Sequence, residues 1–108
     1  MLLLEATIYL DTPSQNTNAL TKDLAAKHVL RPAINFGNDL LFSGEILARD
    51  EVDILYRGRT YDVLIHMFTI EEEAFEAIGH LVKVGHSFSI QAGSRVVGKG
   101  TILDVVYE

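Results

Sequence analysis

The sequence has no cysteine and no tryptophan, and it contains only two prolines. The absence of cysteine excludes disulfide scaffolds, thiol nucleophiles and cysteine zinc sites, and it fits a reducing compartment. No apolar run approaches the ~18 residues of a membrane span, and the N-terminal segment has no basic stretch typical of a secretory signal. We therefore expect a cytoplasmic protein with no membrane association.

Charge and length limit the kinds of partner and the number of domains. Nine Lys and Arg residues against fifteen Asp and Glu residues give a net charge of -6, which disfavours non-specific binding to nucleic acid. The 108 residues suffice for one hydrophobic core, and no proline-rich, glycine-rich or repetitive tract divides them. We expect a single domain over residues 1–108, in which any RNA contact depends on a local basic patch.

Alternation of apolar and polar residues predicts strands over most of the chain. Between Leu2 and Leu10 the even-numbered residues are apolar, whereas most odd-numbered ones are polar. A glycine turn at Arg57-Gly58-Arg59 is expected to join two further strands tightly. These two strands are expected at residues 52–56 and 60–68, and further extended segments are expected at residues 33–36, 41–48, 88–90 and 96–106.

One short helix or turn, and further along the chain one short helix, are expected between these strands. Residues 19–29 have apolar residues at helical spacing, and Asn18 is a suitable N-cap. Thr69 and Glu72 have the spacing of a capping box, and an apolar stripe follows over residues 75–82. Both elements are expected to be inserted into a strand-rich fold.

Together these segments predict an all-β fold, a small antiparallel β-barrel of about six strands with one or two short inserted helices. Gly98 and Gly100 lie on one face of the last predicted strand. Paired small residues on one strand face indicate a bulge, or a part of the barrel wall where two backbones approach closely.

One partial phosphate-binding motif is present, because residues 93–99 match G-x-x-x-x-G-K. The next position must carry a hydroxyl to bind magnesium but is Gly100, and the residues that follow are strand-like instead of helical. We expect no nucleotide site and no cofactor. The histidines lack metal-ligand spacing and no serine lies in a G-x-S-x-G motif, so we predict no metal site, no catalytic residue and no enzyme.

Basic residues close to tyrosines are the candidates for a binding site. Arg57 and Arg59 flank one turn, while Arg95 and Lys99 are expected to share a strand face. If these side chains converge with Arg31, they would contact RNA phosphates while tyrosines stack on bases. The alternative is that they balance an acidic surface without binding anything.

Four sequence elements together resemble a known barrel family. They are F-S-I-Q-A-G-S-R-V-V-G-K-G-T-I-L at residues 88–103, E-A-T-I-Y-L at residues 5–10, Arg31-Pro32 with Phe36, and Ser43-Gly44. They are similar to the closing strands and turn, the opening strand, the R-P-x-x-x-F element and the T-G pair of one domain. That domain is the C-terminal (third) β-barrel domain of translation elongation factor Tu, here as a stand-alone protein.

The resemblance implies a barrel of the kind that contacts the T arm of aminoacyl-tRNA, the GTPase domain and the exchange factor. This chain has no GTPase motif of its own. The positions that match family contacts, or replace one conservatively, are Arg31, Ser43, Gly93 and Arg95. The family's glutamine, lysine and glutamate are replaced by Ala33, His66 and Ala92. Each lost hydrogen bond removes about 1 kcal/mol, so inherited tRNA binding is expected to be weakened.

The leading hypothesis is a non-catalytic binding module that engages a translation-related protein partner, in a mimic, decoy or immunity-type role. The alternative is a tRNA- or RNA-binding module that uses a local basic patch. A third reading, a small enzyme, would need His66 or His86 beside an acid in a pocket. Unpaired strand edges would also permit a homodimer. The candidate partner- or RNA-binding residues are Arg31, Ser43, Arg57, Arg59, His66, Gly93, Arg95 and Lys99.

Overall fold

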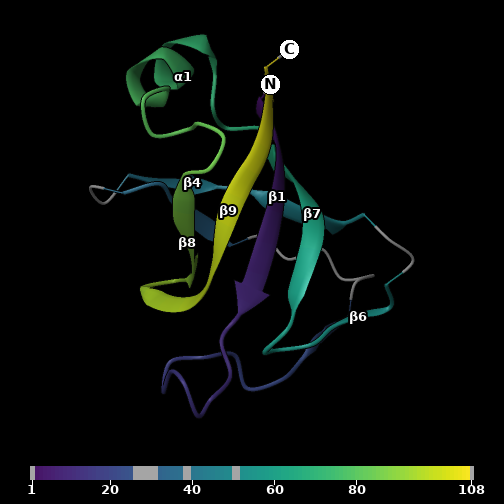
Figure 1. Ribbon diagram of the computed structural model, residues 1–108. Coiled ribbons are helices and arrows are strands. Elements are labelled where there is room, and N and C mark those ends of the chain that lie inside the picture. Colours follow the sequence, from purple (N-terminus) through teal and green to yellow (C-terminus); the bar gives the residue numbers. More distant parts are fainter. Residues whose placement is uncertain (1, 26–31, 38–39, 50–51, 108) are drawn as a thin grey trace.

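A computed structural model of the protein describes residues 2–25, 32–37, 40–49 and 52–107 (Figure 1). Within these residues the fold is all-β, as predicted, with one short helix, α1 (Glu72–Ile78). The strands are β1 (Leu2–Leu10), β2 (Leu24–Ala25), β3 (Ala33–Asn35), β4 (Leu41–Ser43), β5 (Glu45–Ala48), β6 (Ile54–Leu55), β7 (Thr60–Met67), β8 (Ser87–Ala92) and β9 (Arg95–Tyr107).

Seven strands form one antiparallel sheet in the order β4-β3-β8-β9-β1-β7-β5. A flat sheet of this width would hold its outer strands about 29 Å apart, at about 4.8 Å per strand. The two outer strands, however, are consecutive in the chain and are separated by Gly44 alone. The sheet therefore curls, and it forms a half-barrel around the hydrophobic core (Figure 1).

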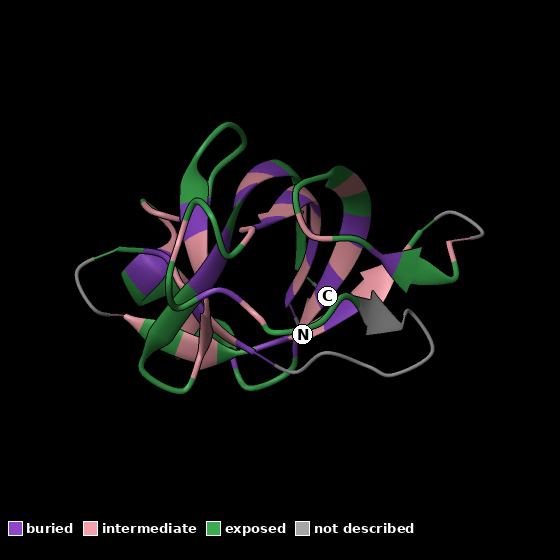
Figure 2. Cartoon of the chain, turned by 90° about the horizontal axis from the view of Figure 1, so that it is seen from below, coloured by how far each residue is buried: buried purple, intermediate pink, exposed green. Residues whose placement is uncertain are grey.

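The core lies on the concave side of the curled sheet. Along β1, every second residue from Leu2 to Leu10 is buried and the residues between them are partly exposed, which confirms the predicted strand and its alternation. The same banding of buried and intermediate residues is visible around the barrel in Figure 2. Residues of β1 with odd numbers therefore define the outer, convex face of the sheet.

Close backbone approach at two glycines of β9 is also confirmed. A Cβ atom added to Gly98 would lie 2.6 Å from the Tyr9 carbonyl oxygen, and one added to Gly100 would overlap the ring of Phe88. β9 has a bulge at Val97. Two consecutive residues of β8 pair with Gly98 and Val96, so Val97 between them has no partner on β8. A second bulge lies at Leu103, where the pairing with β1 shifts by one residue.

The predicted strand over residues 41–48 is divided in two at Gly44, because β4 pairs with β3 while β5 pairs with β7. A Cβ atom at Gly44 would lie 2.7 Å from Met67 Sδ, so a larger residue at this corner would have to displace the Met67 side chain. Residues 52–56 also differ from the expectation. Only β6 forms there, and it pairs with β2 instead of with the strand beyond the turn.

The segment expected to form a short helix or a turn is irregular up to β2, and the later helix forms over fewer residues than its apolar stripe. The described part of residues 19–29 contains no helix, because the loop before β2 is fixed by tertiary contacts: the Asn16 side-chain amide donates to Asp11 Oδ2 and to the Val96 carbonyl. Residues 26–29 lie outside the described residues. The later helix is shorter than predicted. Its N-cap is Glu71, without a side-chain capping bond, and it ends at Gly79.

We predict that Gly98→Ala lowers the free energy of unfolding by about 1–3 kcal/mol, because the new methyl group has no space against β1. The measurement is chemical denaturation with unchanged m-value. Ser94→Ala, in the exposed β8–β9 turn, is the control and should stay close to wild type. Equal stability of the two variants would contradict the close approach of β9 to β1.

Candidate functional site

Two rows of polar side chains cross the outer face of the sheet. Strand pairing places directly opposed residues on the same face, so the register defines each row. The first polar row runs through Thr60, Tyr9, Lys99, Ser89 and Asn35. The second polar row, one step along the strands, runs through Asp62, Thr7, Thr101 and Ser87.

The polar rows border two adjoining depressions, which we call the Lys99 groove. One depression, of about 390 Å³, is lined mainly by Thr7, Tyr9, Gln15, Thr60, Ser87, Lys99 and Thr101. The other, of about 380 Å³, is lined by Asn35, Phe36, Gly37, Ser87, Phe88, Ser89 and Lys99. Ser87 and Lys99 contribute to both. The Lys99 ammonium lies 5.5 Å from the centre of the Tyr9 ring, within cation–π range.

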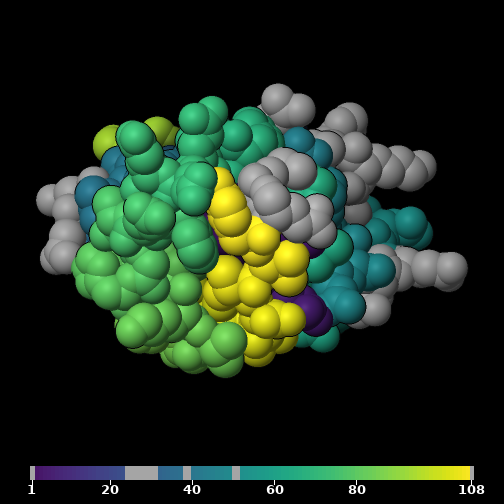
Figure 3. Space-filling view, turned by 90° about the horizontal axis from the view of Figure 1, so that it is seen from above, coloured from purple at the N-terminus to yellow at the C-terminus, as the bar shows by residue number. Residues whose placement is uncertain are grey.

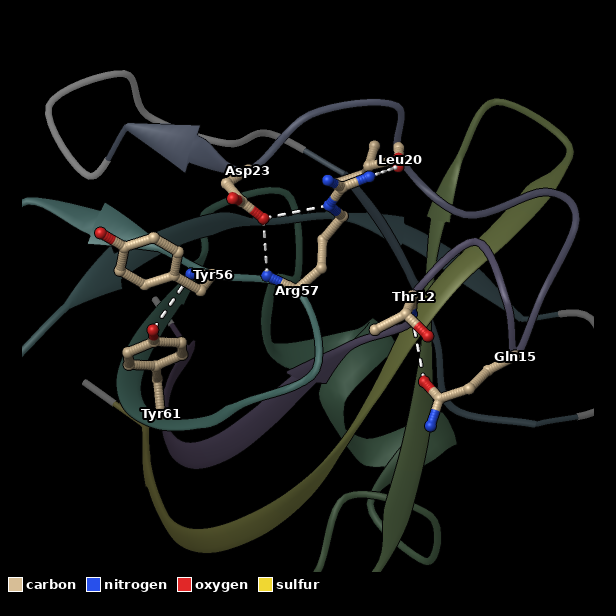
Figure 4. Close-up of polar contacts among 7 residues, drawn as sticks. All are labelled: Thr12, Gln15, Leu20, Asp23, Tyr56, Arg57 and Tyr61. Atoms are coloured by element: carbon tan, nitrogen blue, oxygen red, sulfur yellow. Dashed lines mark hydrogen bonds and ion pairs between the residues drawn. The ribbon is translucent and has the colours of Figure 1, made fainter.

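Arg57 is engaged in fixing a loop. Its backbone N–H and its Nε–H both donate to Asp23 Oδ1, at 2.9 and 3.0 Å, and its Nη1 donates to the Leu20 carbonyl at 2.8 Å (Figure 4). The backbone hydrogen bond, followed by the side-chain one, holds the pKa of Asp23 below its ordinary value of 3.8. These contacts tie the loop before β2 to the turn before β7.

Arg59 lies against an aromatic ring on the same turn. Its guanidinium carbon is 5.0 Å from the centre of the Tyr56 ring. The Tyr56 N–H donates to the Tyr61 hydroxyl at 3.0 Å, as Figure 4 shows. The predicted combination of a cation and tyrosines is therefore present at this turn, but the two arginines of the turn have different contacts.

The expectation that Arg95 and Lys99 share a strand face is wrong. Arg95 pairs with Ala92 and Lys99 pairs with Ser89, three residues apart on β8, so the two side chains lie on opposite faces of the sheet. The cause is the bulge at Val97, which inserts one residue and reverses the alternation between these positions.

The other predicted residues are dispersed. Ser43 ends β4 and is exposed, and Gly93 forms the β8–β9 turn with a φ of 63°. His66 lies on the outer face opposite Leu3, whereas Lys99 lies opposite Tyr9. These two positions of β1 are six residues apart, which corresponds to about 20 Å along the strand. Arg31 lies outside the described residues. The predicted set therefore does not form one site among the residues that the structure describes.

The sequence-based reasoning missed an apolar surface, which we call the outer apolar patch. Four members lie on the outer face of β1, β5, β7 and β9 by strand register, and the fifth is the exposed bulge residue of β9; they are Leu3, Leu47, Leu64, Val106 and Leu103. Leu103 and Val106 are 43% and 40% exposed. His66 lies beside Leu3 within this surface. Runs of adjacent apolar residues at 2–4, 46–48 and 63–65 were the available signal, since they interrupt the alternation.

Figure 3 looks down on the end of the barrel that carries both chain ends, where the C-terminal part of β9 reaches the surface beside α1. Phe75 of α1 stacks on Tyr107 there, with 4.8 Å between ring centres. Among the described residues, no helix is long and apolar enough to cross a membrane, and no three potential ligands are grouped to hold a metal ion.

We predict that Arg57→Gln raises the pKa of Asp23 toward 3.8, because one hydrogen bond and the adjacent positive charge are lost. In the wild-type protein the lowered pKa stabilises the fold above pH 3.8, and this contribution disappears as the pH falls through the folded-state pKa. Carboxyl NMR titration of Asp23 measures the change. An identical titration midpoint in both proteins would show that the Arg57 side chain does not act on Asp23.

No family model matches this chain, and a search of curated proteins finds no match to it.

Proposed function

We propose that this chain is a non-catalytic binding module that docks a translation-related protein partner on its outer apolar patch. The observation that carries the proposal is the patch itself. Leu3 lies directly opposite Val106, and Leu47 lies directly opposite Leu64 on the neighbouring strand pair. Contiguous apolar side chains on an exposed face are typical of protein interaction surfaces.

The strands that carry the patch are held rigidly. β1 is paired with β7 from Leu2 to Tyr9 on one side and with β9 from Leu2 to Leu10 on the other. Side chains on such strands lose little conformational freedom when a partner binds, so more of the gain from burying them contributes to affinity. The patch is thus a preformed docking surface.

The charges beside the patch favour a partner with a basic rim. Glu5 forms an ion pair with Arg49, whereas Asp104 uses one carboxylate oxygen to accept a hydrogen bond from the Val105 N–H. The chain as a whole carries a net charge of -6. A partner with apolar residues at its centre and Lys or Arg around them would complement both features.

The translation-related identity of the partner is inferred from the resemblance to the C-terminal barrel domain of elongation factor Tu. A barrel of this kind would compete for a component that touches the elongation factor, as a mimic, a decoy or an immunity-type protein. The RNA-binding alternative has less support, because Arg57 is bound to Asp23 while Arg95 and Lys99 face opposite sides of the sheet.

The test begins with affinity capture from host-cell lysate at low and raised salt, with identification of both proteins and RNA. A translation factor that is recovered is then purified, and its direct binding to the chain is measured. Val106→Asp should weaken this binding at least tenfold, since it places a charge in an apolar contact. Val84→Asp is the matched control, because Val84 is 64% exposed and lies outside the patch.

Three results would overturn the proposal. Equal binding by both variants would place the contact elsewhere on the chain. Recovery of RNA that raised salt releases would favour the RNA-binding alternative, because phosphate contacts weaken steeply with salt. Sedimentation equilibrium provides the third: a dimer that Val106→Asp dissociates would identify a second copy of this chain as the occupant of the patch.

A further inference from the structure

We infer that the Lys99 groove binds a small phosphate monoester, with the phosphoryl group beside Lys99 and Ser87. These two residues are shared by both depressions of the groove, so a group bound between them is reached from either side. The site lies on the polar rows and does not include the outer apolar patch. It is therefore independent of the proposed protein partner.

Charge selects an anion for this groove. Among the described residues that line the two depressions, Lys99 is the only charged one. Within the described part of the chain no carboxylate forms an ion pair with Lys99, and its contact is with the neutral ring of Tyr9. The nearest acidic member of the rows, Asp62, is on β7, two strands or about 10 Å away from β9.

Hydroxyl groups supply the remaining donors. Thr7, Thr101 and Ser87 are directly opposed across β1, β9 and β8, in the row next to Lys99. Within the described residues, none of these three side chains forms a hydrogen bond. Three hydroxyls and an ammonium group match the three terminal oxygens of a phosphoryl group better than the two oxygens of a carboxylate.

The size of the groove indicates that the phosphoryl group is carried on a larger molecule. Each depression has a volume of nearly 400 Å³, at 390 and 380 Å³, which is in the range of small-molecule sites. The ring of Tyr9, which lies beside Lys99 on the outer face, gives the first depression an apolar wall, while the side chains of Ile8, Phe36 and Phe88 point into the core. The Tyr9 ring therefore offers a place for the carbon skeleton of the ligand.

The test is an NMR titration of the isotope-labelled protein with glycerol 3-phosphate at constant ionic strength, with glycerol and acetate as matched probes. We expect saturable shifts at the amides of Ser87, Lys99 and Thr101, and tighter binding than for either matched probe. Lys99→Gln should weaken binding at least tenfold, because it removes a charge-assisted hydrogen bond. Lys83→Gln, at an exposed lysine outside the groove, should bind as the wild type does.

Other outcomes would overturn the inference. These are unchanged binding by Lys99→Gln, equal affinity for acetate, or shifts that centre outside the groove. Tighter, Lys99-dependent binding of a short RNA would assign the groove to nucleic acid instead. If Lys99→Gln disturbs the spectrum beyond the groove, Thr101→Val replaces it, and it should also weaken binding. Val106→Asp should leave phosphate binding intact, so failure here is distinguishable from failure of the proposed protein contact.

Discussion

Continuity of the chain through Gly44 is the constraint on which the architecture depends. The two edge strands of the seven-stranded sheet, β4 and β5, are joined by this single residue. The sheet therefore has to bend until its two edges lie next to each other. Met67, Ile65 and Ile34 pack so closely around Gly44 that an added β-carbon would have to displace the Met67 side chain. The bend determines which face of every strand is concave and buries a core, and which face is convex and available for binding.

The convex face is divided by polarity along the strands. Near the chain ends it presents the outer apolar patch, and toward the other end of β1 it presents hydroxyl groups and Lys99. The bulge at Leu103 decides which residues of β9 join the apolar part. Without the shift at Leu103, the residues after Ile102 would exchange faces, and Val106 would point toward the core instead of outward. One strand thereby contributes to both proposed sites.

Several basic residues of this acidic chain stabilise local structure. Arg57 joins the loop before β2 to the turn before β7, and Arg49 pairs with Glu5 across the outer face. Arg59 lies on Tyr56. The prediction of a basic patch required that basic side chains close in sequence be free to converge on a ligand. Lys99, one of the predicted basic residues, lines both depressions of the groove. No carboxylate of the described residues forms an ion pair with it.

The sequence by itself determined the all-β class, the full extent of β1, the β8–β9 hairpin turn and the glycine-lined face of β9. These follow from alternation, turn chemistry and residue size, which are properties of one segment. Tertiary structure alone decided the division at Gly44, the pairing of β2 with β6, the early end of α1 and the faces on which Arg95, Lys99, Leu103 and Val106 lie. A bulge or an exchange of partner depends on hydrogen bonds to strands distant in sequence, and one inserted residue reverses every side chain beyond it.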